Sequence, residues 1–221
     1  MKSLLTISSL PLLIAAFLAA LLAGCSDPAD AVPKSAASAP KAGLPGATEV
    51  GVGYVIRAGS TLGFTGSKVT GSHNGGFTNF AGGFRIAEGK LVGSPELKIA
   101  MKSVWSDNEK LTGHLLSPDF FDAAQFPVST FTVTSVEPAG PKHTVTGNLN
   151  LHGVTKSISF PADVQVTPEK VTLKAEFAIN RRDFNVNFPG KPNDLIRDNV
   201  VLRFDILATP GPATAADTLA P

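Results

Sequence analysis

Cysteine is almost absent from this 221-residue chain: Cys25 is the only one, so no intrachain disulfide can form. Charge is also sparse and balanced, with 19 Lys and Arg against 18 Asp and Glu and a formal net charge of +1. No basic field is therefore available to gather nucleic acid or an anionic membrane surface. Walker, dinucleotide-binding and Gly-x-Ser-x-Gly motifs are missing as well. The absences argue against a nucleic-acid partner and give no support to an enzyme.

The N-terminus contains the longest apolar run of the chain, over residues 4–22, behind a weakly positive start. It ends in the small-residue sequence Leu22-Ala23-Gly24-Cys25. A charged start, an apolar middle and small residues at the end are typical of a secretory signal. The alternative is an uncleaved membrane anchor, because the run is close to the roughly 20 residues that span a bilayer. We expect residues 1–24 to be a signal peptide.

The small pair before the single cysteine resembles a bacterial lipoprotein signal. The resemblance implies that Cys25 becomes the N-terminus and carries lipid, and several acyl chains on one residue anchor a protein stably. It also implies a location on the periplasmic side of a bacterial membrane. Ser26 follows Cys25, and Asp27 comes one place later than an inner-membrane retention signal of enteric bacteria. The outer membrane is therefore favoured.

Two segments have almost no large apolar side chains. Residues 25–51 are rich in Ala, Pro, Gly, Ser and Asp, and residues 209–221 have the same character. Neither can bury enough surface to offset chain entropy. We predict a lipidated flexible tether at 25–51, a folded domain at 52–208 and a disordered tail at 209–221.

Within 52–208, apolar and polar residues alternate with a period of two, as in half-buried strands. The predicted strands cover 52–57, 62–70, 77–86, 91–104, 128–136, 144–151, 155–166, 171–179 and 200–206. A turn is expected at 71–76, a bend or bulge at Gly82 and Gly83, and a polar loop at 181–198. The prediction is an all-β, antiparallel, up-and-down barrel of about eight strands.

Residues 114–131 (HLLSPDFFDAAQFPVSTF) interrupt this alternation. Asp107 is positioned to cap a short helix containing Lys110 and Leu111, and Pro118 would end it. We interpret the stretch as a mostly helical crossover whose adjacent Phe120 and Phe121 plug one mouth of the barrel. Two residues next to each other on a helix diverge by about 100°, so one ring would enter the lumen and the other would pack on the rim. The alternative is an ordinary loop pinned to the core.

The predicted inward face of the barrel is apolar and uncharged. A barrel of about eight strands has an interior that side chains fill or that holds one small ligand. The candidate ligand-binding residues are Phe64, Phe77, Leu97, Ile99, Leu115, Phe120, Phe121, Phe131, Phe160, Phe177, Phe204 and, near the mouth, Arg181. For each aromatic the alternative is that it only fills the core.

Three segments together resemble the YceI-like family: HLLSPDFFDAAQFPVSTF, LNLHGVTKSISFP and FAINRRDFNV. Arg182 and Asn185 depart from the family pattern, which more often has one arginine and a glycine at these places. The resemblance implies a lipocalin-like barrel that binds a polyisoprenoid or a quinone tail and does not catalyse a reaction. Burying such a tail, at ~25 cal/mol per Å², offers on the order of 10 kcal/mol before the costs of association.

The remaining polar candidates have ordinary structural explanations. The histidines His73, His114, His143 and His152 show no metal-ligand spacing, so we expect no metal and no cofactor. Asp119 and Asp122 are interpreted as flanks of a short helix. Arg181, with Arg182 and Asp183, is either a head-group contact or part of a surface ion pair.

Two other functions stay open: an accessory interaction module of a respiratory membrane protein, and an enzyme acting on isoprenoid lipids. The identity of the ligand and whether the protein forms a homo-oligomer are not encoded in any motif.

Overall fold

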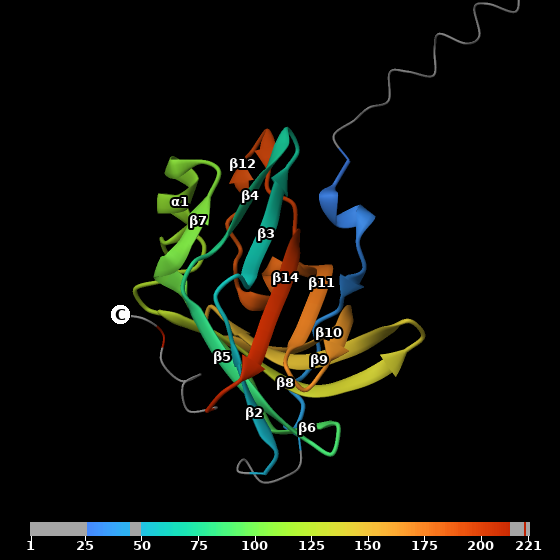
Figure 1. Cartoon of the computed structure of the whole chain (residues 1–221). Coiled ribbons are helices and arrows are strands. Elements are labelled where there is room, and N and C mark those ends of the chain that lie inside the picture. Colours follow the sequence, from blue (N-terminus) through green and yellow to red (C-terminus); the bar gives the residue numbers. More distant parts are fainter. Residues whose placement is uncertain (1–25, 45–49, 213–218, 220–221) are drawn as a thin grey trace, which may run out of the picture.

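The fold is a closed β-barrel, shown in Figure 1 as a computed structural model that describes residues 26–44, 50–212 and 219. Within this part of the chain, the barrel has eight antiparallel walls, each made of one strand or of two strands in line. It closes where β11 (Val171–Asn180) pairs with β14 (Asn199–Pro210). The all-β barrel expected from the alternation is confirmed. Cys25 and the apolar run before it lie outside the described residues.

Three of the eight walls are long strands broken in the middle. They are β2 (Val52–Ile56) with β3 (Thr61–Lys68), β4 (Gly71–Phe77) with β5 (Phe80–Ala87), and β6 (Lys90–Ala100) with β7 (Val104–Ser106). Two of the breaks, at residues 78–79 and 101–103, lie side by side: the Thr78 amide donates to the Ser103 carbonyl (3.2 Å) and the Ala100 amide donates to the Asn79 carbonyl (3.0 Å). The half of the barrel beyond the breaks, with β3, β4 and β7, is the half that carries the helix (Figure 1).

The other walls follow one another as a meander through β8 (Val128–Ala139), β9 (Lys142–Leu151) and β10 (Val154–Val166). Their turns use residues with positive φ, namely Gly140, His152 and Gly153, which suits tight connections. The bulge expected near Gly82 and Gly83 is confirmed, because the register between β5 and β6 shifts between Gly83 and Arg85.

The turn expected at residues 71–76 is wrong, because this stretch is strand β4. Its glycines serve close packing here. A Cβ on Gly75 would lie 2.3 Å from the Phe64 ring, and one on Gly76 would lie 2.5 Å from the Leu62 carbonyl oxygen. The composition that resembles a turn is therefore what lets β4 lie against β3.

The crossover contains helix α1 (Glu109–Leu115), the only α-helix of the described residues. Asn108 caps it by accepting from the Leu111 amide (3.0 Å), so the assignment of the cap to Asp107 is wrong. The Asp107 carboxylate instead accepts from the Asn74 amide (2.8 Å) and pairs with His73 (2.7 Å between Oδ1 and Nδ1). These contacts fasten the start of the crossover to β4.

The segment expected to be a flexible tether is partly built into the wall. Strand β1 (Lys34–Ser35) pairs in parallel with Ala178 and Ile179 of β11. Ser38 forms a bridge to Ser157 of β10. Because β10 pairs with β11 only over residues 163–166 and 171–174, the segment fills the gap where those strands separate.

Short elements complete the fold: η1 (Pro28–Ala31), η2 (Met101–Ser103), η3 (Arg181–Phe184), β12 (Gly190–Lys191) and β13 (Asp194–Leu195). At the other terminus, Thr209 and Pro210, expected to be disordered, form the end of β14. Residues 213–218 and 220–221 of the predicted tail lie outside the description. No helix of the described residues has the length and apolar character to cross a bilayer.

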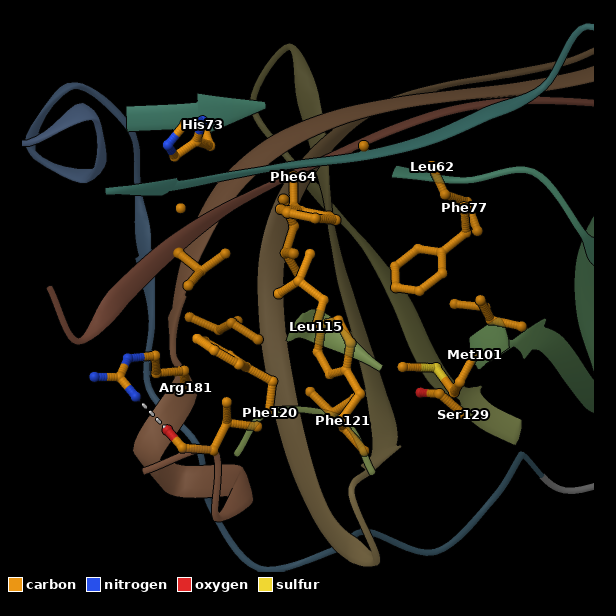
Figure 2. Close-up of a pocket in the computed structure, with 18 of the residues that line it drawn as sticks. Leu62, Phe64, His73, Phe77, Met101, Leu115, Phe120, Phe121, Ser129 and Arg181 are labelled. Carbon is orange, nitrogen blue, oxygen red and sulfur yellow. Dashed lines mark hydrogen bonds between the residues drawn. The ribbon is translucent and has the colours of Figure 1, made fainter. Parts of the chain in front are cut away.

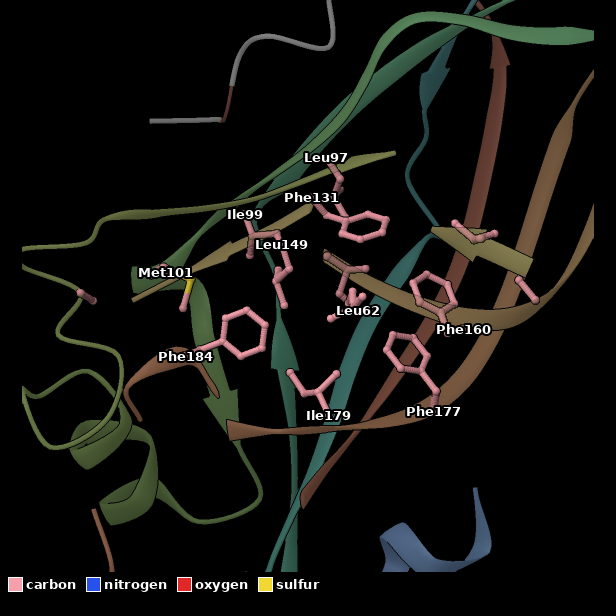
Figure 3. Close-up of a cluster of buried hydrophobic side chains, with 14 residues drawn as sticks. Leu62, Leu97, Ile99, Met101, Phe131, Leu149, Phe160, Phe177, Ile179 and Phe184 are labelled. Carbon is pink, nitrogen blue, oxygen red and sulfur yellow. The ribbon is translucent and has the colours of Figure 1, made fainter. Parts of the chain in front are cut away.

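The two largest apolar clusters of the described residues lie in the barrel interior. The larger one surrounds the stacked rings of Phe160 and Phe177 (Figure 3). The smaller one, with Phe64, Val104, Leu115, Phe120 and Val186, lies toward α1. Between them is the space described next.

Candidate ligand-binding cavity

A cavity of about 340 Å³ lies in the half of the barrel next to α1 (Figure 2). Its apolar lining consists of Leu62, Phe64, Phe77, Ile99, Met101, Leu111, Leu115, Phe120, Phe121, Leu149, Leu151, Ile179, Val186, Ile196, Val200, Leu202 and Phe204. On β14 the alternation is strict, since Val200, Leu202 and Phe204 line the cavity while Arg203 points outward. Such a lining suits an apolar ligand, and the volume is within the usual range of ligand pockets.

Polar side chains reach the cavity at few points. Lys68, His73 and Asn108 lie at the rim, where each is at least partly exposed to solvent. Ser67 and Ser129 are buried: the Ser67 hydroxyl donates to the Asp27 carboxylate (3.3 Å) and the Ser129 hydroxyl donates to the Asn150 carbonyl (2.6 Å). The interior thus offers a ligand little polar contact.

A floor of phenylalanines closes the cavity on the side away from α1. Phe160 and Phe177 stack with centroids 4.0 Å apart, and Phe204 meets both rings edge-on at 5.8 and 5.6 Å. Phe131 packs 5.7 Å from Phe160. Only Phe204 of this group also lines the cavity.

The structure divides the residues predicted to bind ligand into two sets. Those on the cavity are Phe64, Phe77, Ile99, Leu115, Phe120, Phe121, Phe204 and Arg181. Those in the packed core instead are Leu97, Phe131, Phe160 and Phe177. The period-two pattern identifies an inward side chain but not its height along the barrel axis. It therefore cannot distinguish a residue of the packed phenylalanine floor from a residue that lines the cavity.

Phe120 and Phe121 both line the cavity, contrary to the expectation that only one would (Figure 2). The expectation assumed a helix, but α1 ends at Leu115 and both phenylalanines lie in the turn that follows. Phe121 packs 6.0 Å from Phe77 at ring centroids. Phe120 lies 5.4 Å from Phe188 of the loop at 185–198.

Arg181 lines the cavity, but its guanidinium is already hydrogen-bonded to main-chain carbonyls of the protein. It is 4% exposed. Its guanidinium donates to the carbonyls of Val186 (2.5 Å), Ile196 (3.3 Å) and Arg197 (3.0 Å). Burial lowers the pKa of Arg181, and Arg182 lowers it further, while Asp198 opposes both. The predicted surface ion pair belongs mainly to Arg182, whose Nε donates to Asp198 (2.5 Å).

The loop that Arg181 holds covers part of the mouth. Its strands β12 and β13 form a hairpin, and the Lys68 ammonium of β3 forms an ion pair with Asp194 there. Backbone bonds join the same elements, with the Arg197 amide donating to the Ser67 carbonyl (2.9 Å). The hydrogen bond from Lys68 is the main cause that lowers the pKa of Asp194. The loop was expected to be merely polar, yet it contributes Val186 and Ile196 to the lining.

Two histidines at the rim are paired with carboxylates. His73 pairs with Asp107, and backbone bonding from Asn74, followed by His73, lowers the pKa of that carboxyl. His114 Nε2 lies 2.7 Å from Asp119 Oδ2, while its ring meets Phe120 edge-on. Among the described residues no group of three or more His, Cys, Asp or Glu is arranged to hold a metal.

Sequence reasoning omitted several strand residues from the site, among them Met101, Leu149 and Leu151. All three belong to alternating stretches, so the period-two signal was available for them. Val186 and Ile196 had no such signal, because they lie in an irregular loop.

Comparison with known sequences identifies a YceI-like domain over residues 54–208. A UPF0312 protein of Pseudomonas putida is 34% identical over 127 residues, which cover 53% of this chain and 65% of that protein. Protein YceI of Salmonella arizonae is 33% identical over 119 residues, covering 51% of this chain and 62% of the relative. The chain thus aligns with less than two thirds of either curated relative.

Solved structures show the same fold. Burkholderia cenocepacia BcnA superposes with a TM-score of 0.62 at 26% identity, covering 69% of this chain and 98% of BcnA. A polyisoprenoid binding domain from Saccharophagus degradans gives a TM-score of 0.60 at 22% identity, covering 72% of this chain and 99% of that domain. With its domain match over most of the barrel, the chain belongs to the YceI-like domain family.

Proposed function

We propose that this protein is a membrane-anchored periplasmic binding protein that holds an elongated apolar lipid, such as a polyisoprenoid or a quinone tail. The observation that carries the proposal is the apolar cavity, which opens beside α1 and ends at a phenylalanine floor. A cavity with one open end suits a tail that enters lengthwise and leaves its polar head at the rim.

The energetics favour a hydrocarbon ligand. Each buried methylene contributes about 0.8 kcal/mol, reduced by the cost of ordering a flexible tail. A charged ligand would gain little inside, because the guanidinium of Arg181 is bonded to main-chain carbonyls and its pKa is lowered by burial. The structurally similar domain from Saccharophagus degradans is a polyisoprenoid binding domain, which supports this choice of ligand.

The anchor is part of the proposal. Leu22-Ala23-Gly24-Cys25 supports lipid attachment at Cys25 on the periplasmic face, with the outer membrane favoured because Ser26 follows. Cys25→Ser is expected to release the protein from the membrane fraction. Continued tight attachment of that variant would contradict a lipid anchor at this residue.

Extraction of the purified protein with organic solvent, followed by mass spectrometry, tests the ligand. Leu202→Trp fills the cavity and is expected to abolish recovery of an isoprenoid or quinone. Leu207→Trp is the matched control, since Leu207 has the outward parity of β14 and is absent from the lining. Equal lipid recovery from both variants, or no lipid from the unaltered protein after loading with ubiquinone, would refute binding in this cavity.

A further inference from the structure

The N-terminal segment is fastened to the open end of the barrel. The Asp27 carboxylate accepts from the Ser67 hydroxyl (3.3 Å) and lies 3.9 Å from Nη1 of Arg197. Ala29, 1% exposed, packs on Ala178 and Val201. In Figure 1 the start of this segment, in blue, lies toward the end of the barrel with β12 and the turn between β3 and β4, and the rest runs down along β11.

This attachment fixes where a lipid on Cys25 emerges. Cys25 is two positions before Asp27 in the sequence, and two residues of chain can reach no further than about 8 Å. Ser67, the partner of Asp27, lines the cavity. An anchor at Cys25 therefore holds the barrel by the rim of its cavity.

The same end presents exposed apolar side chains. Val69, in the turn between β3 and β4, is 54% exposed, and Leu195 of β13 is 50% exposed. The two are adjacent, because the Val69 amide donates to the Leu195 carbonyl (3.2 Å). Asp194, the carboxylate next to them, is neutralised by Lys68. We call Val69 and Leu195 the apolar tip.

We infer that the apolar tip rests in the interface of the membrane to which Cys25 is anchored, so that the cavity opens toward the bilayer. The inference rests on the proposed lipid anchor. Three observations agree on one end of the molecule: the docked segment, the apolar tip, and the rim residues Ser67 and Lys68. Apolar side chains seated about 5–10 Å into the headgroup region are typical of interfacial contact. A tail would then pass from bilayer to cavity with little exposure to water.

The opposite end supplies a matched control. Val166, at the end of β10, is 55% exposed, as much as Val69. It lies away from the rim, because β10 and β11 turn there and Val171 pairs with Ala208 near the end of β14. Exposure alone therefore does not indicate which end of the barrel faces the membrane. The docked N-terminal segment does, because it holds the anchor at the rim of the cavity.

The test uses the full lipidated chain in vesicles of phosphatidylethanolamine and phosphatidylglycerol. Cys25 is the only cysteine. In the proposed lipoprotein its sulfur carries the lipid, so a new cysteine is the only free thiol. Val69→Cys, Leu195→Cys and the control Val166→Cys are each labelled with an environment-sensitive fluorophore. We expect emission to shift to the blue, and nitroxide lipids to quench it, at 69 and 195 but not at 166.

The inference would be overturned if, in vesicle-bound protein, the labels at 69 and 195 stayed accessible to a water-soluble quencher. It would also be overturned if the label at 166 were shielded from that quencher. Protein that fails to sediment with the vesicles would overturn both the anchor and the orientation. Lipid recovery from the Leu202→Trp variant judges ligand binding separately, so failure of the orientation is distinguishable from failure of the binding function.

Discussion

Neighbouring arginines in this protein have unlike roles. Arg181 is buried and satisfies three main-chain carbonyls, whereas Arg182 pairs with Asp198 at the surface. Arg181→Met leaves those carbonyls without a donor and is expected to lower the free energy of unfolding by about 3 kcal/mol. Arg182→Met removes an exposed pair and is expected to cost less than about 1 kcal/mol. Urea denaturation of both variants checks this, and equal losses would contradict the assigned roles.

At the residue scale, sequence reasoning identified which side chains point inward better than what they do there. Phe177 and Phe204 follow the same alternation, yet one is sealed in the core and the other lines the cavity. From the sequence, Arg181 is either a head-group contact or part of a surface ion pair, because its charge is visible there and its three acceptors are not. Those acceptors belong to residues 5 to 16 positions further along the chain. Their convergence depends on the path of an irregular loop.

The β12–β13 hairpin is an element held across the mouth partly by one ion pair. Lys68 lowers the pKa of Asp194, so the folded value is below the unfolded value of about 3.9. The pair therefore stabilises the hairpin above that pH, and the stabilisation is lost as pH falls through the folded pKa. Protection of the Val69 and Arg197 amides, taken relative to their intrinsic exchange rates at each pH, is expected to fall below about pH 4.

Asp194→Asn is expected to show faster exchange of these two amides already at neutral pH and a weaker acid dependence. Asp205→Asn, in an exposed pair with Lys174 on the barrel wall, is the control and should leave both amides unchanged. If Asp194→Asn retained the full acid dependence, another carboxylate would be responsible for holding the hairpin.

The N-terminal segment behaves in the structure as a wall element. The Ser38 amide donates to the Ser157 carbonyl (2.9 Å) and the Ala178 amide donates to the Pro33 carbonyl (2.8 Å). Ala29→Asp buries a charge against Ala178 and Val201 and is expected to unprotect both amides and lower stability by about 1–3 kcal/mol. Ala36→Asp, at an exposed position of the same segment, is the matched control. Unprotected amides in the unaltered protein would mean that the segment is a free tether.

Regular elements were predictable and irregular ones were not, for physical reasons. In sequence, residues 144–151 and 171–179 alternate because the inward face meets the apolar core and the outward face is mostly polar. Ala178 is an exception on the outward face, since it is buried against Ala29. Residues 34–38 join the wall through backbone hydrogen bonds and small side chains, which leave no hydrophobic pattern. The strand at Gly71–Phe77 was missed because its glycines, needed for contact with β3, are also the residues of turns.

On the scale of the whole molecule, the barrel is divided into a packed half and a hollow half. The packed half contains the ring stack of Phe160 and Phe177, and the hollow half begins where three walls break near residues 57–60, 78–79 and 101–103. The breaks let β3, β4 and β7 leave the course of β2, β5 and β6. A ligand is therefore limited in length by the floor and not by the mouth.

This division predicts a limit on tail length. Each five-carbon isoprene unit that enters contributes about 3–4 kcal/mol gross at ~0.8 kcal/mol per carbon, less the cost of ordering it. The gain in melting temperature on adding quinones of increasing tail length should therefore rise and then level off when the tail reaches Phe204. Phe204→Ala removes the ring that separates the cavity from the packed half and is expected to shift the plateau to longer tails.

The same change should cost at most about 3–5 kcal/mol of stability, because a partly buried aromatic that packs on Phe160 and Phe177 is lost. Phe84→Ala is the control, since Phe84 stacks on Tyr54 (5.5 Å between centroids) and is absent from the cavity lining. It should lower stability without moving the plateau. Thermal melts across a series of tail lengths measure both quantities. A plateau at the same tail length in Phe204→Ala and the unaltered protein would show that the phenylalanine floor does not set the depth of the site.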